Sequence, residues 1–319
     1  MSLCYDTWII NYNMKITIKG ENKMFGRRSD GVELKTMPAE FKLMPMLMKE
    51  RSDSQVFFNQ DVPIAAIEEY ISKKNEEGIR ITLIDVVFAG IVRILGQRPA
   101  LNRFAKNGRA YQRNGITICM SIKKSLTDEG EETTIKVPFT GKENLFEVKD
   151  KLQKLIAENK SQENENGTDK TADFLSKIPT GILKAVVGLL AHLDNKGRLP
   201  KKIIEISPFH TSAFVTNVGS LGIDSIYHHI YNFGTTSLFF AVGKKKKSYV
   251  FEDDEIVKEK CVNLAFVGDE RICDGYYYAH SFKMLTRYLR HPELLEKTLD
   301  EELAEKEKEK VMWIIKNIN

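Results

Sequence analysis

The chain has 319 residues, 42% of them hydrophobic, so it can bury a large core as one large domain or two smaller ones. Its formal net charge of +4 is small for this length and gives no reason to expect a nucleic-acid partner. The four cysteines show no C-x-x-C spacing, which argues against a zinc site or a disulfide framework and favours free thiols. The longest apolar run, 182–193, is too short to span a bilayer, and no secretory signal is found. A cytoplasmic protein without membrane partners is therefore expected.

Residues 1–50 are expected to form an N-terminal arm, with one short helix near 45–48. Val56–Asn59 then predicts a strand. Ile64–Asn75 predicts a helix, because its apolar residues recur at helical spacing.

The next helix is predicted over Leu83–Leu95, which is apolar nearly all round and must be buried on most sides. Thr82 and Asp85 have the spacing of a capping box at its start, and Pro99 follows its end.

Two strands, 116–122 and 133–139, are predicted to pair through a turn at 128–130, and 145–159 predicts an amphipathic helix. Residues 161–170 are polar and indicate a linker. Gly167–Lys170 superficially resembles a lipoyl-carrying hairpin but lacks the all-β context, so no lipoyl attachment is predicted.

Residues 172–193 predict a helical hairpin broken at Pro179, whose apolar stripe indicates core packing or an oligomer contact. A role at a membrane surface is disfavoured because the basic polar face of an interfacial helix is missing. Lining a pocket for an acyl chain is a further alternative for this segment.

Strands are predicted over 237–243 and 262–267, with the basic run Lys244–Lys247 as a solvated turn. His228 and His229 would project to opposite sides of an extended segment, which argues against one metal bound by both, and no metal site is predicted. Tyr276–Leu289 predicts a helix after an Asp-Gly turn, and 301–310 a charged tail helix.

Three motifs together resemble the catalytic domain of 2-oxo acid dehydrogenase acyltransferases, within the chloramphenicol acetyltransferase-like superfamily. They are Pro99-Ala-Leu-Asn102, Phe214-Val-Thr-Asn-Val-Gly-Ser-Leu-Gly222, and Asp269-Glu-Arg-Ile-Cys-Asp-Gly275 with its following helix and Pro292-Glu-Leu-Leu295. The resemblance implies an α/β fold, a chloramphenicol acetyltransferase-like two-layer sandwich in which helices flank a mixed β-sheet. It implies an acyltransferase-like domain over 51–296, with a helical insertion at 160–200 and a charged C-terminal helix at 297–319.

The resemblance also implies a trimer or larger assembly, with the active site between subunits and coenzyme A as a substrate. The family's catalytic histidine is replaced by Glu270, while Thr216 occupies the position of the hydroxyl that stabilises the oxyanion. Asp274 is the third candidate catalytic residue, although an aspartate in this turn can be purely structural. The candidate substrate-binding residues are Asn217, Gly219, Arg271 and His229.

Glu270 leaves three interpretations open. In the first interpretation the protein is an acyl-coenzyme A-dependent acyltransferase whose base is Glu270 with a raised pKa, or a nearby histidine. An ordinary glutamate is about four pKa units less basic than a thiolate, a deficit of roughly 5–6 kcal/mol. Glu270 can therefore deprotonate a thiol only if burial raises the pKa of its carboxyl group. The candidate histidines are His229, His210 and His280. Alternatively the protein is an inactive trimeric scaffold, with Glu270 paired to Arg271 or Arg103. In the third interpretation the acyl acceptor is an amine or alcohol, which suits a carboxylate base.

Overall fold

The computed structural model describes residues 28–124, 132–160, 175–252 and 254–318. The expected turn at 128–130, the linker with Gly167–Lys170, and Cys4 lie outside these residues. The elements are β1 Gly31–Glu33, α2 Ala39–Leu47, η1 Ser52–Ser54, β2 Gln55–Pro63, α3 Ala65–Glu76, α4 Leu83–Gln97, η2 Pro99–Asn102, β3 Arg103–Lys106, β4 Arg109–Arg113, β5 Ile116–Lys123, β6 Glu132–Phe139, α5 Leu145–Lys160, α7 Thr180–Asn195, α8 Lys201–Ile206, β7 Ala213–Asn217, η3 Val218–Leu221, β8 Leu238–Glu252, β9 Glu255–Asp269, α9 Gly275–Arg290, η4 Pro292–Glu296 and α10 Leu299–Ile318. No described helix is long and apolar enough to cross a membrane.

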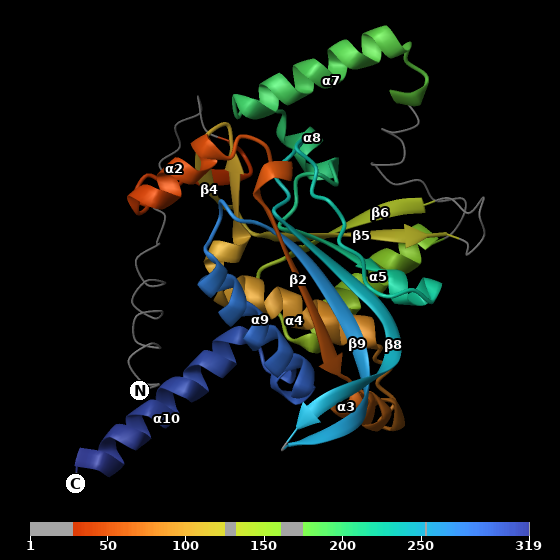
Figure 1. Cartoon of the computed structure of the whole chain (residues 1–319), viewed down its shortest axis with the longest axis vertical. Coiled ribbons are helices and arrows are strands. Elements are labelled where there is room, and N and C mark those ends of the chain that lie inside the picture. Colours follow the sequence, from red (N-terminus) through yellow and green to blue (C-terminus); the bar gives the residue numbers. More distant parts are fainter. Residues whose placement is uncertain (1–27, 125–131, 161–174, 253, 319) are drawn as a thin grey trace.

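A six-stranded mixed sheet in the order β2-β9-β8-β7-β5-β6 forms the centre of the molecule (Figure 1). β7 runs parallel to both β5 and β8, and the other neighbours are antiparallel. β1, β4 and β3 form a second, small sheet. The mixed sheet with its flanking helices confirms the predicted fold class.

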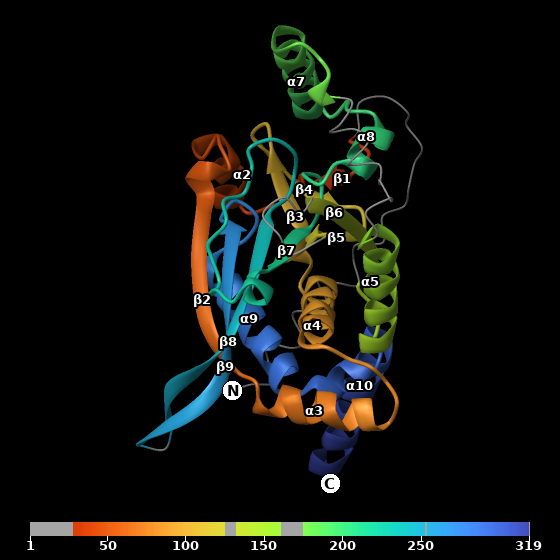
Figure 2. The same cartoon turned by 90° about the vertical axis from the view of Figure 1, so that its right-hand side faces the viewer.

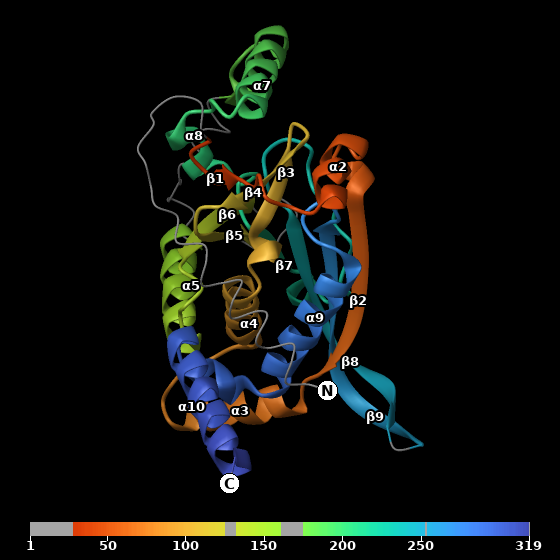
Figure 3. The same cartoon turned by 90° about the vertical axis from the view of Figure 1, so that its left-hand side faces the viewer.

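Helices α4 and α9 lie on one side of the large sheet, where they cover the main hydrophobic core (Figures 2 and 3). α4 is buried along most of its length, as its uniformly apolar sequence predicts. Thr82 and Asp85 form the predicted capping box, in which each side chain accepts a hydrogen bond from the backbone N–H of the other residue.

The opposite side of the sheet carries a smaller cluster of hydrophobic residues from β7, β8 and β9. Because side chains alternate along a strand, Phe239 and Ala241 face away from the side that Phe240 and Val242 present to the main core. Among the described residues, the loop segment 226–233 covers part of this second face, with Ile230 packed into its cluster. A sheet face covered by a loop leaves room for a cavity.

The prediction that Lys244–Lys247 form a turn is wrong. These residues lie inside β8, which continues with β9 as a long hairpin that projects beyond the body of the protein (Figure 2). The strand accommodates the lysines because ion pairs form with neighbouring elements: Lys245 and Lys260 approach Glu68 at 2.6 and 2.8 Å. The basic run is thus a strand segment of the hairpin that pairs with β9.

The prediction of core packing is also wrong for residues 175–193, the part of that segment that the structure describes. Pro179 does interrupt the segment, but α7 begins immediately after it and extends away from the body (Figure 1). Ile182 and Leu189 are each 58% exposed. The oligomer contact and the acyl-chain pocket both stay predictions for this helix.

The two ends of the described chain agree in part with expectation. α2 covers Ala39–Leu47 and is longer than the predicted helix, with Pro45 inside it. The tail helix α10 covers Leu299–Ile318, which is longer at both ends than the 301–310 predicted from the charge pattern and lies within the expected 297–319. Cys119, Cys261 and Cys273 are buried free thiols, as expected.

Candidate functional site

A cavity of about 340 Å³ lies on the loop-covered face of the sheet. Strands β5, β6, β7 and β8 form its floor and the loops 208–209 and 226–236 form its walls. The lining residues are Ser121, Glu132, Thr134, Pro208, Phe209, Phe214, Thr216, Ile226, His228, His229, Ile230, Tyr231, Phe233, Thr236 and Phe239.

Thr216 is the candidate catalytic residue that lines this cavity. It lies on β7 two positions after Phe214, so both side chains emerge on the loop-covered face. A hydroxyl in this position can donate a hydrogen bond to a ligand in the cavity. The placement agrees with the expected oxyanion role without testing it.

The motif residues after Thr216 are not among the cavity lining. The carbonyl oxygen of Asn217 accepts a hydrogen bond from Ser220 Oγ at 2.7 Å. At Gly219 a Cβ atom would lie 2.4 Å from the carbonyl oxygen of Gly243, so this position must be glycine for β8 to approach. The structure therefore gives Gly219 a packing role, and substrate contacts by Asn217 and Gly219 stay predictions.

His228 and His229 lie in a loop, so the opposite orientation expected for an extended strand does not apply to them. Their rings stack on each other with centroids 4.6 Å apart. His228 also stacks on Phe239 at 4.4 Å, and Phe239 stacks on Phe214 at 5.2 Å. Four nearly parallel rings thus cross the cavity floor. No group of three or more potential metal ligands occurs in the described part of the chain.

Glu270 lies elsewhere, at the far end of β9. Its backbone N–H donates a 2.8 Å hydrogen bond to Ser54, which continues the ladder between β9 and β2. Its half-buried side chain has no hydrogen bond or ion pair among the described residues. The pairing with Arg271 or Arg103, expected for a scaffold, is therefore not present.

The strand register separates Glu270 from Thr216. Thr216 pairs with Ala241, which pairs with Ala265, five residues before Glu270. At about 3.3 Å per residue and 4.8 Å per strand, the two positions are roughly 20 Å apart in one chain. One subunit by itself therefore does not bring the two candidate groups to one reacting atom.

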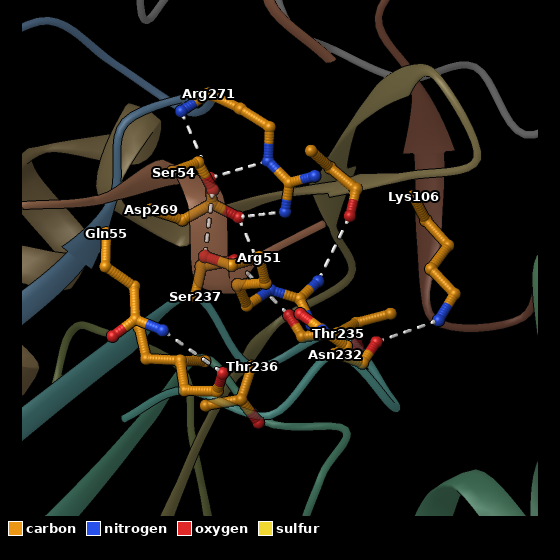
Figure 4. Close-up of polar contacts among 12 residues, drawn as sticks. Arg51, Ser54, Gln55, Lys106, Asn232, Thr235, Thr236, Ser237, Asp269 and Arg271 are labelled. Atoms are coloured by element: carbon orange, nitrogen blue, oxygen red, sulfur yellow. Dashed lines mark hydrogen bonds and ion pairs between the residues drawn. The ribbon is translucent and has the colours of Figure 1, made fainter. Parts of the chain in front are cut away.

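The residue before Glu270 is held by two arginines (Figure 4). Arg271 donates to both carboxylate oxygens of Asp269 at 2.8 and 2.7 Å, and Arg51 Nε approaches it at 3.3 Å. Ser54 Oγ donates a further hydrogen bond to Asp269 at 3.0 Å. Burial alone would raise the pKa of Asp269, but the hydrogen bonds and charge of Arg271, with the charge of Arg51, outweigh it and lower the pKa.

The remaining donors of these arginines bind backbone carbonyls. Arg51 donates to Tyr231 at 2.7 Å and to Ala105 at 3.1 Å, and Arg271 donates to Met48 at 3.1 Å. Arg271 is buried and engaged within the protein, so it positions the Glu270 turn. Contact with substrate by Arg271 stays a prediction.

Asp274 caps helix α9. Its side chain accepts a 2.6 Å hydrogen bond from the backbone N–H of Tyr277. Asp274 is otherwise exposed to solvent. Asp274 therefore has the structural role of a helix cap, and its participation in the chemistry remains a prediction.

The other candidate histidines are placed differently. His210 is fully buried beside Asp194, and burial lowers its pKa although the Asp194 carboxylate opposes this. Its Nδ1 lies 2.8 Å from Ser207 Oγ. His280 packs on Tyr276 of α9. Of the three histidines proposed as bases, only His229 lines the cavity.

Comparison with solved structures identifies the fold as that of chloramphenicol acetyltransferase, to which the chain is 10% identical over 81% of its length and 99% of the other chain, with a TM-score of 0.51. Residues 202–296 match the family model of the 2-oxoacid dehydrogenases acyltransferase (catalytic domain). These findings confirm the resemblance drawn from the sequence motifs.

Two further similar structures have TM-scores below 0.5. One is a probable dihydrolipoamide acetyltransferase from Listeria monocytogenes, 15% identical over 82% of this chain and 95% of that chain, with a TM-score of 0.48. The other is a truncated catalytic core of the 2-oxoacid dehydrogenase multienzyme complex from Thermoplasma acidophilum. It is 13% identical over 82% of this chain and 99% of that chain, with a TM-score of 0.45. The search of curated proteins returned no match.

Sequence reasoning missed the phenylalanine and tyrosine rings of the cavity, the role of Arg51, and the contact of Arg271 with Asp269. Phe214 and Thr216 share one face of β7, as Phe239 and Ala241 do on β8, so alternation could have placed both rings beside the hydroxyl. Nothing in the sequence indicated Arg51, which lies 218 positions from Asp269.

Proposed function

We propose that this protein is an acyltransferase that moves an acyl group from a coenzyme A thioester to an acceptor. Thr216 stabilises the oxyanion and Glu270 carries the proton. The observation that carries the proposal is the position of Thr216, the motif hydroxyl, in the wall of a cavity of ligand size. Support also comes from the match of residues 202–296 to an acyltransferase catalytic domain.

The proposed reaction is direct acyl transfer. The acceptor attacks the thioester carbonyl carbon, and Thr216 donates a hydrogen bond to the resulting oxyanion. The carbon–sulfur bond then breaks. Glu270 takes the proton from the acceptor and returns it to the departing thiolate, so coenzyme A leaves as a free thiol.

An amine acceptor suits this base best. A thiol must be deprotonated before attack, which an ordinary carboxylate does poorly. A neutral amine attacks first and becomes acidic only in the tetrahedral intermediate, where a carboxylate can accept its proton. The free Glu270 side chain is available for that step.

The separation of roughly 20 Å between Thr216 and Glu270 favours a site shared between subunits. In a closed symmetric oligomer, the Glu270 of one copy can approach the Thr216 of the next. We therefore propose a homotrimer or a larger assembly built from trimers.

The proposal is tested by thiol release from acetyl-coenzyme A with a panel of amine, alcohol and thiol acceptors. We expect turnover by the native protein and a loss of activity of 100-fold or more in Glu270→Gln. Glu293→Gln is the control, because Glu293 is exposed and its replacement should leave the activity unchanged. If the native protein is silent while Glu270→His gains activity, the chain is an inactive scaffold and the proposal fails.

A further inference from the structure

The cavity beside Thr216 has an aromatic end. His228, Phe239 and Phe214 stack with interplanar angles of 7° and 8°, which presents flat ring faces and edges along the cavity floor. Phe209 packs edge-on against Tyr231 and Phe233, with centroids 5.0 and 5.7 Å apart, and these three rings also line the cavity. Such walls favour a flat aromatic ligand over a flexible aliphatic one.

The other end of the cavity is polar and contains Thr216. The register of β5 with β7 aligns Met120 with Val215, so Ser121 follows beside Thr216. Ser121 pairs with Thr134 on β6, and its hydroxyl also donates a hydrogen bond to Glu132. A row of hydroxyl groups thus ends at a carboxylate.

The charge of the cavity excludes one class of ligand. Glu132 is its one charged lining residue apart from the histidines, and no lysine or arginine lines it within the described part of the chain. Lys123 faces Glu132 across the ladder but does not line the cavity. An anionic group would meet no counter-charge here, so the phosphates of coenzyme A need another place.

The aromatic and acidic ends together match an amine that carries an aromatic ring. Aromatic rings attract an ammonium group, and a nearby carboxylate adds a hydrogen bond and an opposite charge. A volume of about 340 Å³ is at the lower limit for small-molecule pockets, so the ligand must be compact.

We infer that this cavity binds the acyl acceptor and that the acceptor is an arylalkyl amine, in which an alkyl chain joins the nitrogen to the aromatic ring. Its ring lies against the stack of His228, Phe239 and Phe214, and its nitrogen lies at the Thr216 and Glu132 end. The role of the bound amine as acyl acceptor rests on the proposed function. Its binding statement can be tested alone.

The acceptor binds as an ammonium ion beside Glu132 and loses one proton to water before it reacts. The neutral nitrogen then forms the bond to the thioester carbonyl carbon while the carbon–sulfur bond breaks. Its second proton passes through Glu270 to the thiolate. The products are an amide and the free thiol, so no oxidant or further reactant is needed.

The test is titration calorimetry of the full chain without any thioester. The probes are 2-phenylethylamine, 2-cyclohexylethylamine with the same charge but no aromatic ring, and phenylacetate with the ring but a negative charge. We expect 2-phenylethylamine to bind about 10-fold more tightly than either of the others.

Variants assign the binding to this cavity. His228→Leu should weaken the binding of 2-phenylethylamine about 10-fold. Glu132→Gln should remove most of the difference in affinity between 2-phenylethylamine and phenylacetate. Tyr249→Leu is the control, because Tyr249 is an exposed aromatic residue on the β8–β9 hairpin, outside the cavity. Equal binding of the two amines, or no effect of either cavity variant, overturns the inference.

The outcome is separable from that of the proposed function. If 2-phenylethylamine binds as described but no acyl transfer occurs, the proposed function fails and the binding site stands. If acyl transfer occurs to thiols or alcohols while 2-phenylethylamine neither binds nor reacts, the proposed function stands and this inference fails. Tight binding of a fatty acid in place of the amines would make the cavity an acyl-chain pocket and would also overturn it.

Discussion

Arg51 and Asp269, 218 positions apart in the chain, form a buried ion pair at the end of strand β9. The same arginine donates to the carbonyl oxygens of Tyr231 and Ala105. Arg51 therefore links the end of β9, directly before Glu270, to the loop that covers the cavity. Arg51 shares the positioning of the Glu270 turn with Arg271 and Ser54, and it also anchors the loop at Tyr231.

Removal of the Asp269 carboxylate should destabilise the fold. Asp269→Asn leaves the buried guanidinium groups of Arg51 and Arg271 without a counter-charge, which typically costs about 3–5 kcal/mol. Asp300→Asn is the control, because its pair with Lys142 is exposed on both sides and contributes about 1 kcal/mol or less. Urea denaturation of both variants measures the difference, and similar losses would contradict the role of the buried pair.

The contribution of Asp269 should depend on pH. Its pKa is lowered in the folded state, so its ionised form stabilises the protein above the ordinary pKa of about 3.9. This stability is lost as the pH falls through the lower folded pKa. The free energy of unfolding of the native protein minus that of Asp269→Asn should be constant from pH 7 to about 5 and should shrink below about pH 4. A difference that stays constant to pH 3 would mean that the carboxylate is not stabilised by its partners.

Asp274 should matter to stability through its capping bond. Asp274→Ala removes the acceptor for the Tyr277 N–H and should cost about 1 kcal/mol, whereas Asp274→Ser should recover most of it. Thermal unfolding measures this. The same variants separate the two roles of Asp274: equal kcat/KM values for Ser and Asp at this position indicate a cap, and a large loss in the Ser variant indicates direct participation.

Gly219 should not tolerate a side chain. A Cβ atom would lie 2.4 Å from the Gly243 carbonyl oxygen, so Gly219→Ala must push β8 and the Thr216 segment apart. We expect a loss of about 1–3 kcal/mol and reduced binding of 2-phenylethylamine. Gly188→Ala is the control, since no atom lies within 4 Å of its Cβ position in α7, and it should stabilise the protein by about 0.5–1 kcal/mol. Denaturation curves that move in the same direction for both variants would contradict this account.

Local sequence patterns predicted the elements whose causes are local. The capping box of Thr82 and Asp85, the buried helix α4 and the turn before α9 follow from residues a few positions apart. The motif around Thr216 and the Asp-Gly turn also led to the fold. Short-range periodicity and capping were sufficient in these places.

The features that escaped prediction depend on distant partners. Lys245–Lys247 remain in a strand because β9 pairs with them, and acidic residues of β2 and α3 compensate the charges of Lys245 and Lys246. The cavity exists because the 226–233 loop packs over β7 and β8, which no local pattern indicates. Arg51 and Asp269 likewise meet only in the folded chain.

The central claim, that Thr216 and Glu270 of different subunits form one active site, is tested most directly by complementation. Thr216→Val and Glu270→Gln should each lower acyl transfer by 100-fold or more when assayed alone. Co-refolding them in equal amounts should restore activity to about a quarter of the native value, because about a quarter of the interfaces in a randomly mixed trimer pair an intact Thr216 with an intact Glu270. Light scattering confirms that the mixture assembles like the native protein. Activity in the assembled mixture that stays at the level of the single variants would contradict the shared site.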